Sequence, residues 1–172
     1  MKYVISLILV LASGMLAAMA CFRKKSGFGA RLSHAGFALV LLGFCCSFLA
    51  EIKSSFVVYG NEKTKIREIY DGNGGLRDLG FYFVLDGISP GVNAPCAELS
   101  FEHDDGTGAN AIVRVNRPAR HGGWHFYLSD YDMVSSDFVK LTVRKDPGRV
   151  PVFTGMAILM LGIACAAMEK KS

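Results

Sequence analysis

Three long stretches of the chain contain no Lys, Arg, Asp or Glu, and they constrain the fold more than any other feature. They span residues 3–22, 33–50 and 150–168. Each is about long enough to cross a ~30 Å hydrocarbon core as a helix that rises ~1.5 Å per residue. With 51% hydrophobic and 20% charged residues, the chain is also too apolar for an ordinary soluble enzyme. The sequence therefore predicts a membrane protein with three transmembrane helices at these positions.

Residues 51–149 separate the second and third apolar stretches and have the polarity of a soluble domain. Short aromatic or β-branched runs in this region are typical of strands, and they lie at 81–85, 111–115, 125–128 and 138–144. Segments rich in Gly, Asp and Pro separate them and supply turns. The predicted fold is α+β: three transmembrane helices and one antiparallel β domain, which forms a small sandwich or a partly open barrel.

The distribution of basic residues predicts the orientation in the membrane. The loop 23–32 contains Arg23, Lys24, Lys25 and Arg31 without an acidic residue, and the tail 169–172 contains two lysines. Basic loops stay in the cytoplasm, whereas long loops are exported largely regardless of their charge. We therefore expect a multi-pass protein of the inner (plasma) membrane whose domain 51–149 is periplasmic or otherwise extracytoplasmic.

The first apolar stretch has an alternative interpretation as a cleaved signal peptide. Residues 18–21, Ala-Met-Ala-Cys, resemble a loose lipoprotein cleavage site ending at Cys21. Cleavage there would export the basic loop 23–32 and return domain 51–149 to the cytoplasm, against the charge bias. A retained transmembrane helix is the favoured reading of this segment.

The predicted β domain has no recognisable catalytic centre. It contains 12 basic and 14 acidic residues, so the net charge of +4 belongs to the flanks, and nucleic-acid binding has no support. G-x-S-x-G, C-x-x-C, H-E-x-x-H and phosphate-loop motifs are all absent from its sequence. Its histidines, His103, His121 and His125, are interpreted as surface or turn residues. No catalytic residue is predicted.

The cysteines allow two interpretations. Cys45 and Cys46 are adjacent in the second apolar stretch, and Cys96 is the one cysteine of the predicted exported domain. Small sulfur side chains commonly serve as packing residues in membrane helices. Alternatively, these cysteines form a thiol pair that exchanges with a partner or with Cys96, as in a membrane thiol reductase.

His34 is the only histidine within the three apolar stretches. An ionisable side chain inside a membrane segment is costly and is a candidate functional residue for that reason. A neutral imidazole is a good ligand for iron, but a residue so close to the basic loop can also reach the membrane interface without a further role. Gly36 and Gly43 in the same stretch would allow another helix or a flat ligand to approach closely.

The predicted exported domain contains three notable segments: Val115-Asn116-Arg117-Pro118, Gly123-Trp124 and Phe126-Tyr127-Leu128-Ser129-Asp130-Tyr131. They resemble V-N-x-P and G-[WY]-x-F-Y-Q-S-x-Y, the signature of the ResB (CcsB) family of cytochrome c biogenesis system II. Asp146-Pro147-Gly148 and the His34-Ala35-Gly36 start of the second apolar stretch occur in the same order. The resemblance covers roughly residues 33–165, and residue 130 is Asp where the family commonly has Ser or Gly.

The resemblance implies a role in haem traffic. ResB proteins act with a multi-span CcsA (ResC) partner that helps to export haem and attach it to apocytochrome c. His34 matches the intramembrane histidine of that family, which implies a haem b ligand at this position. The signature residues become candidates for recognition of apocytochrome c: Asn116, Pro118, Trp124, Phe126, Tyr127 and Tyr131.

The chain also departs from the family in ways that limit its role. It is shorter than a usual ResB protein, has one predicted span fewer and lacks the tryptophan-rich haem-handling motif, which belongs to the partner. The resemblance therefore implies a non-catalytic subunit. A scaffold or recognition module that does not touch haem is the alternative.

Overall fold

The computed structural model describes residues 2–22, 27–60, 63–89, 95–132 and 137–170. The chain divides into two compact units, one formed by Met1–Glu51 with Asp146–Ser172 and the other by Ile52–Lys145. The first unit is helical and the second consists of antiparallel strands, so the fold is α+β as predicted. Residues 23–25 of the predicted basic loop and Lys171 of the tail lie outside the described residues.

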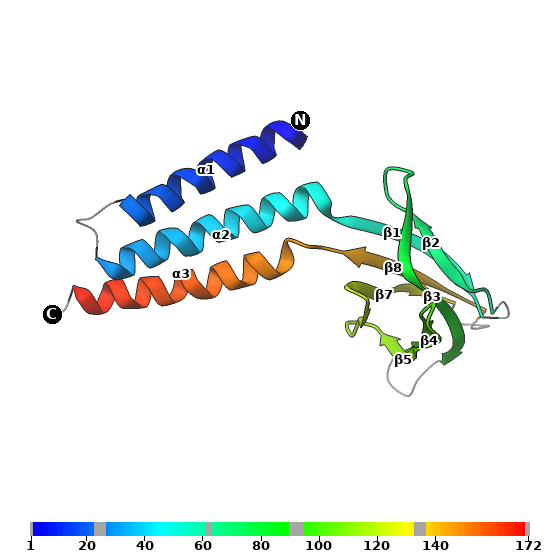
Figure 1. The fold of residues 1–172 in the computed structure, drawn as a ribbon. Coiled ribbons are helices and arrows are strands. Elements are labelled where there is room, and N and C mark those ends of the chain that lie inside the picture. Colours follow the sequence, from blue (N-terminus) through cyan, green and yellow to red (C-terminus); the bar gives the residue numbers. More distant parts are fainter. Residues whose placement is uncertain (1, 23–26, 61–62, 90–94, 133–136, 171–172) are drawn as a thin grey trace. The chain divides into compact units, whose positions relative to one another are not determined.

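The helical unit contains three helices, α1 (Lys2–Phe22), α2 (Phe28–Ala50) and α3 (Arg149–Glu169). They lie in a row with α2 packed against both neighbours (Figure 1). Helix α2 begins at Phe28, before the predicted stretch 33–50, so Arg31 belongs to the helix and not to the loop. Its Nε donates a hydrogen bond to the Ala20 carbonyl oxygen of α1 at 2.7 Å. The long side chain can therefore find a partner at the end of the neighbouring helix.

Helices α2 and α3 meet along a line of glycines, which we call the glycine seam. Glycines occur at every seventh residue on both sides: Gly29, Gly36 and Gly43 on α2, and Gly148, just before α3, followed by Gly155 and Gly162 on α3. A Cβ atom added to any of them would overlap the facing helix, mostly its backbone. Absence of side chains lets two backbones approach closely, which is a common way for apolar helices to associate in a membrane.

Helices α1 and α2 pack through a second line of small residues. Ser6, Ser13 and Ala20 recur at every seventh position of α1, and all three are buried. Cys45 of α2 is buried on the facing side, with its Sγ donating to the Ser6 carbonyl oxygen at 3.7 Å. Helix α2 therefore packs against a line of small residues on α1 and presents its own glycines to α3.

The remaining surfaces of the helices are apolar and exposed. Leu11 of α1 is 64% exposed and Met160 of α3 is 70% exposed. Helices α2 and α3 are long and apolar enough to cross a bilayer, and the apolar part of α1 with described side chains runs from Val4 to Ala20. Two of the three predicted spans thus satisfy the length and composition of a membrane helix, and exposed apolar surface of this extent is typical of contact with lipid or a partner.

The β unit consists of two four-stranded antiparallel sheets. The first has the order β1-β8-β7-β6 and the second the order β2-β3-β4-β5. Strands of the first sheet are β1 (Ile52–Tyr59), β6 (Ala119–His121), β7 (Trp124–Tyr131) and β8 (Phe138–Lys145). Strands of the second sheet are β2 (Ile66–Tyr70), β3 (Leu76–Ser89), β4 (Cys96–Glu102) and β5 (Gly108–Arg114).

The two sheets share one hydrophobic core. Alternate residues of β3, β4, β7 and β8 point inward, as the period of two in a strand requires. Aromatic rings join the sheets: Phe83 of β3 lies 5.3 Å from Phe126 of β7, and Phe101 of β4 lies 5.2 Å from the same ring. Of the two predicted architectures, the described strands form a sandwich.

Candidate functional site

His34 lies in the second turn of α2 and is half-buried. Its Nδ1 is 2.6 Å from the Ala30 carbonyl oxygen, one turn earlier in the helix. Because a carbonyl oxygen can only accept, the neutral imidazole carries its proton on Nδ1 and its lone pair on Nε2. Fixing one ring nitrogen through a backbone carbonyl is the usual way in which proteins orient a histidine for metal binding.

The α2 face that carries His34 also carries exposed phenylalanines. Phe37, Phe44 and Phe48 follow His34 at three, ten and fourteen residues, which places all four on one side of the helix. These phenylalanine side chains are 43%, 53% and 41% exposed. We call this surface the His34 face. Phe37 lies within one turn of His34, whereas Phe44 and Phe48 lie about 15 and 21 Å further along the helix axis. A nitrogen donor on an apolar helix face is chemically suited to a flat, apolar metal complex such as haem.

The first part of the ResB-like signature forms a tight turn between β5 and β6. Arg114 and Arg117 exchange backbone hydrogen bonds of 3.1 and 3.0 Å, with Val115 and Asn116 between them. Asn116 has φ = 62°, a left-handed conformation that Asn tolerates better than most residues. Asn116 is exposed and Pro118 is half-buried. The geometry of this turn accounts for the asparagine without any binding role.

The second part of the signature contributes mainly to the core. Trp124 is 2% exposed and Phe126 is 0% exposed, so neither presents its side chain to a partner. The Trp124 indole Nε1 donates to the Leu79 carbonyl oxygen at 3.2 Å, which satisfies its polar atom. Tyr127 and Tyr131 are half-buried and keep an accessible portion. The signature residues therefore lie mainly in a turn and in a packed strand, and few of them are placed to form a recognition surface.

The three candidate thiols are in different environments. Cys45 is buried against α1, whereas its neighbour Cys46 is exposed, because successive residues of a helix face different directions. Cys96 begins β4 and is partly exposed. Cys45, Cys46, Cys96 and Cys165 are free thiols. This arrangement fits the packing interpretation of Cys45.

Two histidines that are far apart in the sequence meet at one end of the sandwich. His103 follows β4 of one sheet and His121 ends β6 of the other, and their Nε2 atoms lie 3.0 Å apart. The His121 ring stacks on Phe101 at a centroid distance of 4.3 Å and contacts Phe81 edge-on at 4.6 Å. The sequence predicted separate surface or turn residues at these positions, and only the arrangement of the two sheets brings them together.

The acidic residues next to this histidine pair make their contacts with other residues. Burial lowers the pKa of His121 below its usual value, and the neighbouring His103 lowers it further. Asp104, next to His103, is paired with Arg67 at 2.7 Å. Asp105 accepts hydrogen bonds from Thr107, which lower the pKa of this carboxyl group. Both carboxylates next to His103 are thus engaged in local contacts.

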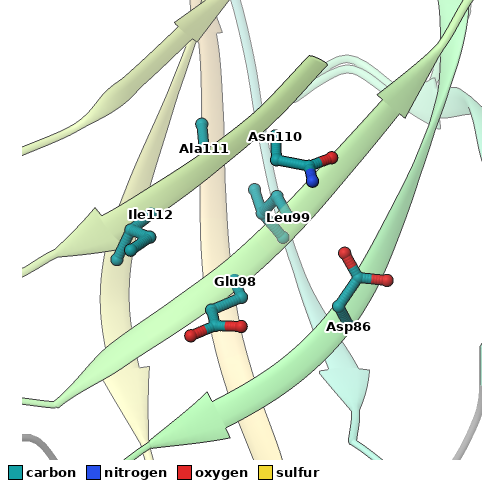
Figure 2. A pocket seen from close by; sticks show the side chains of 6 residues that line it. All are labelled: Asp86, Glu98, Leu99, Asn110, Ala111 and Ile112. Atoms are coloured by element: carbon teal, nitrogen blue, oxygen red, sulfur yellow. The ribbon is translucent and has the colours of Figure 1, made fainter. Parts of the chain in front are cut away.

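A shallow pocket of about 320 Å³ opens on the outer face of β3, β4 and β5. Figure 2 shows the Asp86 and Glu98 carboxylates on neighbouring strands, with Asn110 and Ile112 beside them on β5. Asp86 accepts a hydrogen bond from Ser100, and no ion pair to either carboxylate is found among the described residues. Two carboxylates next to exposed Ile112 suit a cation on an aliphatic stem, such as a lysine side chain.

The comparisons with known proteins concern the fold alone. No family model and no curated protein matches the chain. Among solved structures, the chain is similar to the cytochrome c haem lyase CcmF, with a TM-score of 0.50 and 14% sequence identity. The match covers 94% of this chain and 29% of that chain. The likeness thus extends over nearly all of the present chain, which corresponds in length to less than a third of the neighbour.

Proposed function

We propose that this chain is a membrane subunit that assists in delivering haem and attaching it to apocytochrome c. The observation that carries the proposal is the similarity in fold to a cytochrome c haem lyase across 94% of the chain. The ResB-like signature in residues 115–131 supports the same process from the sequence, independently of the fold. The match covers 29% of the haem lyase, so the activity of that whole protein is not carried over, and the role proposed for this chain is an assisting one.

We further propose that all three helices cross the membrane and that the β unit is exported. The apolar exposed surfaces of α1, α2 and α3 support insertion, and the basic loop 23–32 supports a cytoplasmic position for the α1–α2 connection. Alkaline phosphatase fused after Arg149 should then be active, and a reporter at Ser172 should be cytoplasmic. The reverse pattern would exclude this orientation and favour the lipoprotein interpretation of Cys21.

The His34 face is the proposed contact surface for haem. His34 presents Nε2 with its lone pair available, and Phe37, one turn away on the same face, provides apolar surface. The donor set therefore fits one axial position of a haem iron, with haem b as the expected form. Bound at this site, haem is cargo, and the chain's part is to hold it in a defined orientation before it reaches the apocytochrome.

Haem iron has two axial positions, and His34 can fill only one of them. The second position is the basis for proposing a partner. His34 is the only histidine in the helical unit, so a second strong ligand has to come from another protein or from solvent. We propose a multi-span membrane protein of the CcsA (ResC) type as that partner. The exposed apolar surfaces on both sides of the helical row offer room for its helices.

A second candidate function is recognition of apocytochrome c without contact to haem. The pocket with Asp86 and Glu98 favours it, because a basic polypeptide could place a lysine there. Replacing both with Asn and Gln should then weaken apocytochrome binding and leave haem content unchanged. Loss of haem content without loss of apocytochrome binding would instead favour the haem-holding function.

The proposal is tested by isolating the protein from membranes together with its bound proteins. We expect a many-span membrane protein and haem, visible as a Soret absorption band, to accompany the chain. The His34→Ala variant serves to assign the haem to this chain. Isolation without either haem or a multi-span partner would contradict the proposed function.

A further inference from the structure

A pair of histidines at one end of the sandwich has no role in the function proposed above. His103 and His121 approach through their Nε2 atoms, at 3.0 Å, with ring centroids 5.0 Å apart and ring planes inclined by 41°. The two rings thus direct the same nitrogen toward a shared region at the end of the sandwich. Each Nε2 is an atom that can bind a metal ion when the imidazole is neutral.

The separation of these atoms is that of two neighbouring ligands on one metal ion. Imidazole nitrogens bind Zn²⁺ at about 2.0–2.1 Å, so two of them at a right or tetrahedral angle lie about 3 Å apart. The observed 3.0 Å fits this requirement without a change of backbone. Without a metal ion, a hydrogen bond between the two rings keeps the Nε2 atoms at this distance. The spacing of the two nitrogens is therefore suited to a metal ion before one binds.

The backbone on both sides holds the two rings in place. His103 closes a turn in which its N–H donates to Thr107 at 2.8 Å and its carbonyl accepts from Gly106 at 3.0 Å. His121 precedes the Gly122-Gly123 turn, where φ values of 55° and 81° require glycine. Stacking of His121 on Phe101 fixes its ring plane. A site held in this way loses little freedom when an ion binds.

We propose that His103 and His121 form a binding site for a divalent transition metal ion of the Cu²⁺, Ni²⁺ or Zn²⁺ type. Two imidazoles select such ions over Mg²⁺ and Ca²⁺, which prefer oxygen ligands, and Cu²⁺ binds most tightly of the series. No group of three His, Cys, Asp or Glu side chains suited to a metal exists among the described residues. The remaining coordination positions are therefore filled by water or by a donor from a partner.

The site joins the two sheets, so metal binding has a structural consequence. His103 follows β4 and His121 ends β6, which belong to different sheets. An ion that binds both histidines in the folded state and neither in the unfolded state stabilises the sandwich by an amount that grows with the logarithm of the ion concentration above its dissociation constant. The lowered pKa of His121 supports this role, because a ring that stays neutral competes less with protons for the ion.

The only tryptophan of the chain provides the test. Trp124 is the cross-strand partner of His121, so bound paramagnetic Cu²⁺ should quench its fluorescence. The full-length protein in detergent, with its thiols alkylated beforehand, is titrated with Cu²⁺. We expect quenching that saturates at one ion per chain. Zn²⁺ should compete with Cu²⁺ and raise the melting temperature of the β unit, and Mg²⁺ should do neither.

Histidine variants assign the site. Loss of an outer partner of a metal ligand already costs about 10–100-fold in affinity, so His103→Gln and His121→Gln should each raise the dissociation constant at least about tenfold. His125→Gln, on the same hairpin, is the matched control and should leave the titration unchanged. If His121→Gln unfolds the domain, His103→Gln decides alone. Identical titrations for His103→Gln and the parent protein would overturn the proposal.

Discussion

Gly148 at the N-terminal end of α3 lies against Gly43 of α2, so closely that a Cβ atom on Gly148 would overlap the Gly43 carbonyl oxygen. Nearby, the Ser47 hydroxyl donates to the Asp146 carboxylate at 2.7 Å, and the Gly148 N–H donates to the same carboxylate at 3.1 Å. The Asp146-Pro147-Gly148 segment therefore has a packing role in the helical unit.

The glycine seam predicts a strong effect of side chains at its centre. Gly155→Val should separate α2 from α3, because its Cβ would lie about 2.7–2.8 Å from Val40 and Gly36 atoms. Overpacking of this kind costs about 1–3 kcal/mol or more. Gly14→Val on α1 is the matched control, since nothing lies within 4 Å of an added Cβ there. Thermal unfolding in detergent should distinguish the two, and equal stability of both variants would contradict the seam.

Because Trp124 is buried, we expect its replacement to destabilise the β unit rather than to disturb a binding surface. Trp124→Ala removes a side chain that is 2% exposed, and we expect a loss of about 3–5 kcal/mol. The variant should be degraded and disappear from membranes. Tyr127→Ala, on the other face of the same strand, should accumulate close to the normal level. Normal accumulation of Trp124→Ala with failed cytochrome c assembly would instead indicate a recognition role.

Stability of the β unit should decrease in mildly acidic solution. The pKa of His121 is lowered in the folded protein by burial, whereas an unfolded histidine titrates at about 6.5. The unfolded state then binds more protons between the two pKa values. The contribution of His121 is complete above about pH 6.5 and is lost as the pH falls through the folded pKa.

The melting temperature followed by Trp124 fluorescence at about pH 7.5 and at about pH 5.5 measures this effect in metal-free buffer. His121→Gln should reduce the difference between the two values, and His125→Gln should retain it. An undiminished difference in His121→Gln would assign the acid sensitivity to other groups.

Strand prediction succeeded where the hydrophobic pattern was strong. The predicted segments 81–85 and 138–144 lie within β3 and β8, whose inward residues are large and apolar. β1 and β4 were not predicted, because serines and charged residues interrupt the run of apolar residues in these strands. β6 has three residues, too few for any periodicity. These strands form because they pair with neighbouring strands of the folded sheet, and a local sequence pattern does not contain that information.

The candidate sites also differ in how far the sequence could predict them. His34 could be identified from the sequence because a histidine within an apolar stretch is conspicuous. The contact between His103 and His121 could not, because the residues belong to different sheets and meet only through the packing of the sandwich. Conversely, Trp124 and Phe126 stood out as aromatic signature residues, and their burial became visible only with the inward-facing register of β7.

We propose that this chain holds haem through His34. The most direct measurement is the haem content of the isolated complex carrying His34→Ala, with Ser33→Ala as a neighbouring polar-to-alanine control. Removing a polar side chain does not weaken membrane insertion, so both variants should accumulate. We predict that His34→Ala loses most of its haem and its support of cytochrome c maturation, that added imidazole restores part of both, and that Ser33→Ala retains them. Full haem content and normal cytochrome c maturation in His34→Ala would contradict the account.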